Sequence, residues 1–145
     1  MVRGSFKSSG WDSEVMSQAL REVRLGGRTV WALFDSWAGR SYVVRRAIPR
    51  GTPKGRDPLA RTVGLGGRER RIREWRALIA EADECSFSFK AYALESIGPG
   101  EGRPIELIVG APVMEEFEIS LRPKRGRLVP DMRRLRKGTF VDFAS

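Results

Sequence analysis

Apolar and polar positions alternate with a period of two over most of this chain, which is the pattern of β-strands with one buried face. Residues 19–35 contain two such arms around Gly26-Gly27, and a Gly-Gly pair between alternating runs is a hairpin signal. Residues 59–81 contain a second pair of arms around a glycine-rich bend, and residues 85–97 alternate Phe and Ala with Ser and Lys. The pattern therefore predicts a mainly β protein.

Shorter segments complete the predicted architecture. Residues 105–110, "IELIVG", are an apolar run typical of a buried strand, and residues 111–119 favour a short helix. Residues 120–130 predict a closing hairpin, and residues 40–49 a short helix or strand that ends at its proline. Stretches rich in Gly and Pro predict loops, which are residues 50–58 and 98–104.

Length and composition predict one globular domain, residues 18–145, preceded by a loose N-terminal arm, residues 1–17, rich in Ser, Gly and charge. Apolar residues make up 41% of the chain, a globular share. No apolar run approaches the roughly 20 residues of a membrane span, and the first residues lack the apolar core of a secretory signal. These features predict a soluble cytoplasmic protein with no membrane partner.

Several kinds of active site are excluded by missing residue types. The chain has no histidine, which excludes Ser-His-Asp and Cys-His nucleophilic systems. Cys85 is its one cysteine and follows two acidic residues that disfavour a thiolate, so it is interpreted as a packed small residue. We expect no metal and no cofactor, and a hydrolase of this composition would have to use carboxylates.

The formal net charge is +9, from 27 basic and 18 acidic residues. Residues 67–76 and 122–138 concentrate the positive charge, and such stripes can bind phosphate backbones. The first stripe alternates Arg with Ile72, Glu74 and Trp75, as a strand with one solvated face does. Neither stripe carries a recognisable nucleic-acid motif, so a solvated basic surface is the preferred interpretation and a basic nucleic-acid-binding β-domain an alternative.

Three pieces occur in a characteristic order. An apolar strand ends in Asp35-Ser36 and is followed by Ala38, a glycine-rich bend lies between two later strands, and "LIVG" closes at Gly110 before a short helix. In this order they resemble the retropepsin-like (retroviral-type) aspartic proteases, including bacterial and archaeal members, over about residues 20–128. The resemblance implies a small closed β-barrel of acid-protease type with one or two short helices. An unrelated small β-barrel is the alternative.

Aspartic proteolysis needs two adjacent carboxylates that share one proton. Asp35 is the only acid of the chain in an Asp-Ser/Thr-x-Ala context, so one chain supplies half of the pair. The resemblance therefore implies a homodimer that hydrolyses a peptide or protein substrate, with Asp35 catalytic and the Ser36 hydroxyl linking the two catalytic loops. Gly110 would let its strand pass closely under the catalytic loop.

The resemblance also implies a substrate-binding cleft made by the catalytic loop and a flap. The expected lining residues are Trp37, Ala38, Gly64, Leu65, Gly66 and Gly67. Trp37 departs from the family, which has glycine there and uses its backbone N–H to hold the carboxylates. The indole could shape a substrate pocket, the protein could be a dimeric peptide-binding pseudoprotease without catalysis, or the substitution could belong to this chain alone.

Overall fold

The computed structural model describes residues 18–65 and 68–135 and is mainly β, as the alternating pattern predicts. The predicted N-terminal arm lies outside the described residues. Within the described ranges, no helix has the length and hydropathy needed to cross a membrane. The elements follow in chain order: β1 Gln18–Leu25, β2 Arg28–Asp35, β3 Tyr42–Val44, the 3₁₀ turn η2 Arg45–Ala47, β4 Lys54–Leu65, β5 Arg68–Ala82, β6 Cys85–Leu94, β7 Gly98–Gly100, β8 Arg103–Ile105, β9 Leu107–Gly110, α1 Ala111–Glu116, β10 Ser120–Lys124 and β11 Arg127–Asp131.

The first hairpin forms where the sequence predicts it. Gly26 and Gly27 occupy its turn at φ +54° and +86°, the left-handed region that glycine tolerates best. β1 and β2 then pair in register along their whole length, from Leu25 opposite Arg28 to Gln18 opposite Asp35. The hairpin therefore places the side chain of Gln18 beside the predicted catalytic aspartate.

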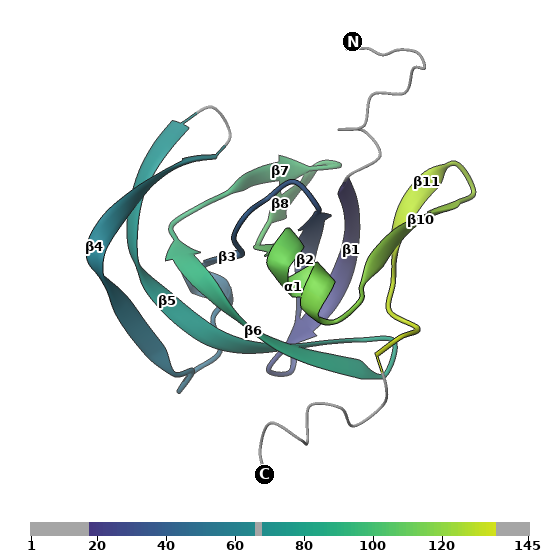
Figure 1. Ribbon diagram of the computed structural model, residues 1–145, viewed down its shortest axis with the longest axis horizontal. Helices are drawn as coiled ribbons and strands as arrows, with labels where there is room; N and C mark the ends of the chain where they lie inside the picture. Colours follow the sequence, from purple (N-terminus) through teal and green to yellow (C-terminus); the bar gives the residue numbers. More distant parts are fainter. Residues whose placement is uncertain (1–17, 66–67, 136–145) are drawn as a thin grey trace.

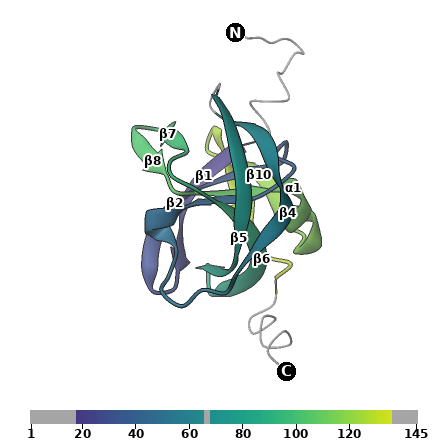
Figure 2. The same cartoon turned by 90° about the vertical axis from the view of Figure 1, so that its left-hand side faces the viewer.

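Seven strands form one sheet in the order β1-β2-β9-β3-β6-β5-β4, and β1 also pairs with β5 (Figure 1). Most neighbours are antiparallel, but β2 and β9 run parallel, as do β3 and β6. β4 and β5, at one end of this strand order, lie on the left of Figure 1 and face the viewer in Figure 2, and the separate β10–β11 hairpin lies on the right of Figure 1. The strand order brings β9, late in the chain, between β2 and β3.

The predicted loop at residues 50–58 is wrong from Lys54 onward, where β4 begins. Gly55 lies opposite Trp75 in β5, and a Cβ atom on Gly55 would lie 2.1 Å from the indole ring. Gly55, whose residue type favours a loop, thus leaves the space that the Trp75 indole needs to pack over β4. The β4–β5 ladder is irregular between Arg56 and Arg61, around Pro58. The prediction of two extended arms over residues 59–81 is confirmed by β4 and β5.

The predicted loop at residues 98–104 is also wrong, because it contains the two short strands β7 and β8. Their turn places Glu101 and Gly102 at positive φ. The Trp31 indole N–H donates to the Gly100 carbonyl at 2.8 Å, which holds this hairpin against β2. A contact with a residue about 70 positions away therefore orders a Gly/Pro-rich segment.

The buried apolar side chains form two clusters. The first apolar cluster includes the large, fully buried side chains Leu25, Phe34, Leu78, Phe87 and Leu107. The second apolar cluster consists of Trp31, Tyr42, Val63, Ile72, Tyr92, Leu94, Ile105 and Ile108, with Leu20, Leu33, Ala38, Trp75 and Ile97 packed against it. The β4–β5 hairpin supplies Val63 and Ile72, so its arms cover the second cluster rather than extend into solvent.

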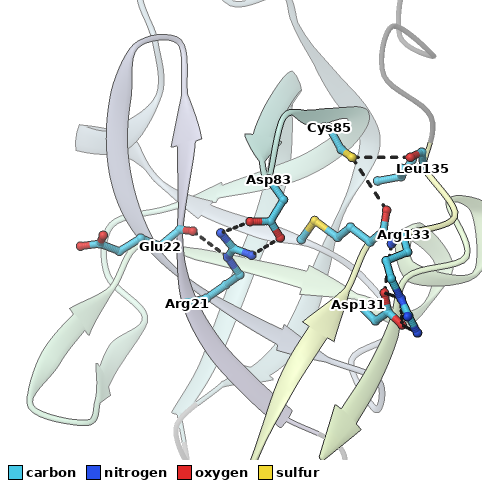
Figure 3. A network of polar contacts seen from close by, with 8 residues as sticks. Arg21, Glu22, Asp83, Cys85, Asp131, Arg133 and Leu135 are labelled. Carbon is cyan, nitrogen blue, oxygen red and sulfur yellow. Dashed lines mark hydrogen bonds and ion pairs between the residues drawn. The ribbon is translucent and has the colours of Figure 1, made fainter. Parts of the chain in front are cut away.

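The turn between β5 and β6 is fastened to β1 and to the end of the described chain (Figure 3). Arg21 donates to both carboxylate oxygens of Asp83, at 2.8 and 3.4 Å. Cys85 is buried in the first apolar cluster, and its thiol faces the carbonyl oxygens of Met132 and Leu135 at 3.8 and 3.5 Å. The interpretation of this cysteine as a packed residue is confirmed.

Candidate functional site

Asp35 is the last residue of β2 and lies opposite Gly110, the last residue of β9. Because β2 and β9 are parallel, their carboxyl ends meet at the same edge of the sheet. The side-chain amide of Gln18 donates to Asp35 Oδ2 at 3.2 Å. The half-buried carboxylate is therefore held between the first strand and the loop that follows β2.

The residues after Asp35 fold into a tight turn. The Ala38 N–H donates to the Asp35 carbonyl at 3.1 Å, and the Trp37 N–H donates to Asp35 Oδ1 at 2.9 Å. Trp37 does not have positive φ, and its indole is 63% exposed. No torsion or close contact requires glycine here, because the backbone contributes the N–H while the side chain lies outside the turn.

Gly110 is where a side chain cannot be added. A Cβ atom there would lie 2.5 Å from the Arg40 carbonyl oxygen and 2.8 Å from that of Ala38. The Gly110 N–H donates to the buried Ser41 hydroxyl at 2.9 Å, and the Ala111 N–H donates to the Ala38 carbonyl at 2.8 Å. The loop therefore rests on β9 through backbone contacts, which confirms the close approach predicted for Gly110.

The structure brings four of the predicted site residues into one turn, namely Asp35, Ser36, Trp37 and Ala38. Ser36 is exposed and Ala38 is half-buried. Of the remaining four, Gly64 lies within β4 opposite Glu69, and Leu65 ends that strand. Gly66 and Gly67 lie outside the described residues. Gly64 thus belongs to a strand rather than to the predicted bend.

The second apolar cluster connects these two groups of residues. Ala38, from the loop that follows β2, packs against the cluster to which Val63 and Ile72 of the hairpin belong. Tyr42 follows the loop directly and pairs with Ile108 on β9. Hairpin and loop therefore face a common apolar surface.

Two polar contacts hold the base of the hairpin. The Tyr92 hydroxyl donates to Asp57 Oδ2 at 2.6 Å, which lowers the pKa of the Asp57 carboxyl, with Arg61 contributing. Burial, followed by the hydrogen bond to Asp57, raises the pKa of Tyr92.

On the other arm, Arg45 donates to Glu74 at 2.7 Å and Arg76 donates to it at 2.6 Å. The hydrogen bond from Arg45 is the main cause of the lowered pKa of Glu74. The carboxylates of Asp57 and Glu74 therefore remain ionised at neutral pH. Asp57 links β4 to β6 through Tyr92, and Glu74 links β5 to the segment after β3 through Arg45.

Sequence reasoning missed Gln18 and Ser41. Counting outward from the Gly26-Gly27 turn places Gln18 opposite Asp35, so the hairpin register could have identified it. Ser41 precedes the apolar residues of β3 and is only 4% exposed, but its partner Gly110 is 69 residues away. No local signal identifies that pair.

Chemically, the described residues provide one carboxylate in a turn rich in backbone donors, beside an apolar surface. Residues 18–65 and 68–135 contain no group of three or more Cys, Asp or Glu side chains placed to hold a metal ion. A single carboxylate cannot act as acid and base in the same step, so peptide hydrolysis at this site needs a second one.

A scan against protein-family models and a search of curated protein sequences each found no match to this chain.

Proposed function

We propose that this chain is one half of a homodimeric aspartic endopeptidase of the retropepsin type, with Asp35 as its catalytic residue. The observation that carries the proposal is the pairing of Asp35 with Gly110 at the ends of two parallel strands, under a loop that rests on Gly110. The retropepsin-like resemblance implies this close approach of the two segments. They are 75 positions apart in the sequence.

The sheet supports the proposed barrel. β1, β2, β9, β3, β6 and β5 pair in succession, and the pairing of Arg24 with Glu81 and of Leu25 with Ala80 links β5 back to β1. We assign the β4–β5 hairpin to the expected flap, because β4 lies beside β5 at the end of the strand order and Val63 and Ile72 of this hairpin belong to the second apolar cluster. The one α-helix follows Gly110 directly, as the resemblance implies.

In the proposed reaction, two Asp35 carboxylates face each other across a twofold axis and share one proton. The ionised carboxylate takes a proton from a water molecule, whose oxygen attacks the peptide carbonyl carbon. The protonated carboxylic acid donates its proton to the carbonyl oxygen. The carboxyl that took the water proton then gives it to the amide nitrogen, the C–N bond breaks, and the other carboxylate takes back a proton from the intermediate as the new carboxyl group forms. The two pKa values belong to the pair rather than to either carboxyl group, because the negative charge of one carboxylate disfavours ionisation of the other at short distance.

Trp37 is compatible with this role. Its backbone N–H already donates to Asp35 Oδ1, which is the contribution expected of the family's glycine. The Trp37 side chain is exposed and lies outside the turn, so in the proposed dimer it can line the substrate cleft. The substitution therefore does not by itself remove the means of holding the carboxylate.

The test is cleavage of an unstructured protein, such as reduced and alkylated casein, across a pH range from 3 to 7. We expect hydrolysis by the wild type and a loss of at least about 10³-fold with Asp35→Asn, in line with removal of a catalytic group. The matched control is Asp83→Asn, because Asp83 is an exposed turn residue at φ 54°, where asparagine is well tolerated.

Sedimentation at several protein concentrations provides the second readout. Active protein should sediment as a dimer, and activity should fall on dilution below the dissociation constant. A strictly monomeric protein that cleaves, or an Asp35→Asn variant that retains activity, contradicts the proposal. Peptide binding without cleavage by either form would instead identify a pseudoprotease.

A further inference from the structure

A cavity of about 650 Å³ lies beside the loop that holds Asp35. Ser36, the residue after Asp35, belongs to its lining, as does Glu115 of α1. Ala111 and Leu121, both half-buried, contribute apolar surface. The proposed dimer brings two Asp35 side chains together, so this cavity lies next to the place where a second copy has to bind.

The edge of this cavity is acidic, although the protein as a whole is basic. Glu115 and its neighbour Glu116 are exposed, and neither forms an ion pair with another residue of the ranges 18–65 and 68–135. Glu118 differs, because Arg134 pairs with it at 3.2 Å. Residues 111–119 contain no basic side chain. The charges of Glu115 and Glu116, which we call the acidic rim, are therefore not compensated within the described part of the chain.

The β10–β11 hairpin carries the opposite charge at its turn. Lys124 ends β10 and Arg125 follows it, and both side chains are exposed. Arg122, two residues before Lys124, pairs with Asp131 at 3.0 Å. Lys124 and Arg125, which we call the basic turn, have no such partner among the residues that the structure describes. Two uncompensated cations therefore lie at the tip of this hairpin.

The hairpin and the cavity belong to one continuous surface. Ser120, the first residue of β10, lines the cavity. The five residues of β10 extend the hairpin from there by about 17 Å, at roughly 3.4 Å for each residue. In Figure 1 its turn lies at the upper side of the molecule, as does the start of β1, where Gln18 pairs with Asp35. The hairpin therefore projects toward the same side as the carboxylate that needs a partner.

A twofold dimer brings the same surface of both chains together, so that each contact occurs twice. With two Asp35 carboxylates at the axis, a hairpin that starts at one cavity extends toward the cavity of the other chain. We infer that each β10–β11 hairpin covers the cavity of the second copy, with its basic turn beside the acidic rim. This inference rests on the proposed function and specifies the surface through which the two copies bind each other.

The test reverses the charges on each side of the contact separately. The rim variant combines Glu115→Lys with Glu116→Lys, and the turn variant combines Lys124→Glu with Arg125→Glu. Sedimentation at low ionic strength, where exposed charges are screened least, gives the dissociation constant of the dimer. We expect each variant to raise this constant by at least about tenfold, because the exposed pairs become repulsive at both contacts of the dimer.

A mixture of the two variants distinguishes a contact between chains from one within a chain. In a mixed dimer the native turn meets the native rim at one contact, and the reversed turn meets the reversed rim at the other. Both contacts are then attractive, so mixing should return the dissociation constant to within about threefold of the wild-type value. A contact within one chain would stay repulsive in both variants. Recovery on mixing also shows that the two variants are folded.

The matched control combines Arg50→Glu with Lys54→Glu. Both residues are exposed, and they follow Pro49, which packs against Gly26 at the end of the first hairpin remote from Asp35. This control changes the net charge by the same amount as the turn variant. We expect it not to weaken the dimer, because a smaller positive charge reduces the general repulsion between two copies.

Dimers that neither the rim variant nor the turn variant weakens overturn the inference, as does a mixture that dissociates as readily as its components. Casein cleavage by the same proteins separates this inference from the catalytic proposal. Asp35-dependent cleavage by dimers that both variants leave intact refutes this inference alone. A wild-type dimer that shows the expected recovery on mixing but does not cleave refutes the catalytic proposal and supports this one. A strictly monomeric wild type refutes both.

Discussion

Replacing Gly110 with alanine is the sharpest test of the geometry that holds Asp35. The added Cβ atom would lie 2.5 Å from the Arg40 carbonyl oxygen and 2.8 Å from that of Ala38, whereas ordinary contacts lie at 3.4–4 Å. Both neighbours are backbone atoms, which cannot rotate away as a side chain can. The loop therefore has to move by roughly an ångström, as overpacked groups do.

The expected cost follows from these contacts. Overpacking of a well-packed site costs about 1–3 kcal/mol, and retreat of the Ala38 carbonyl also weakens its 2.8 Å hydrogen bond from the Ala111 N–H, worth about 1 kcal/mol. We expect Gly110→Ala to lower the free energy of unfolding by about 2–4 kcal/mol. For a domain of this size each kcal/mol lowers Tm by about 2–4 °C.

The measurement is urea unfolding followed by tryptophan fluorescence, with Gly39→Ala as the matched control in the same loop. A Cβ atom on Gly39 meets nothing within 4 Å, and its φ is outside the left-handed region. That variant should be neutral or gain up to about 1 kcal/mol, through the lower entropy of its unfolded chain. Equal stability of the two variants would refute the close approach of loop and strand.

The remaining predictions concern the contacts around this loop and the hairpin. Ser41→Ala leaves the buried Gly110 N–H without its acceptor and should cost about 1–3 kcal/mol in urea unfolding, whereas Ser88→Ala, half-buried on β6, should change stability by less than about 0.5 kcal/mol. Tyr92→Phe removes the main cause of the lowered pKa of Asp57, which should rise toward its ordinary value in a carboxyl-carbon NMR titration. A carboxyl group whose pKa is lower in the folded than in the unfolded state stabilises the fold at pH values above its unfolded-state pKa, and this stabilisation is lost as the pH falls through its folded-state pKa. The stability difference between the wild type and Tyr92→Phe should therefore be present at pH 7 and shrink below about pH 4. An Asp57 carboxyl that titrates alike in both proteins would contradict this prediction.

Local patterns in the sequence were sufficient for the first hairpin, the closing hairpin, the helix after Gly110 and the strand predicted over residues 85–97, which ends three residues earlier at Leu94. In each case the information lies within a few residues, as glycines at a turn or as alternation that distinguishes a buried face. Such signals act through backbone torsion at the turn and through the period-two alternation along a strand, and both are carried by residues close together in the sequence. The aspartate at the end of an apolar strand could also be identified in this way.

Contacts between distant residues decided the rest. Residues 54–58 and 98–104 look like loops because Gly and Pro are poor strand formers, yet Trp75 covers Gly55 and the Trp31 indole holds Gly100. The parallel pairing of β2 with β9, and the Ser41 hydroxyl that accepts from Gly110, join segments about 70 residues apart. A one-dimensional pattern records which side chains are buried but not which strand they meet, because that pairing depends on packing of the whole sheet.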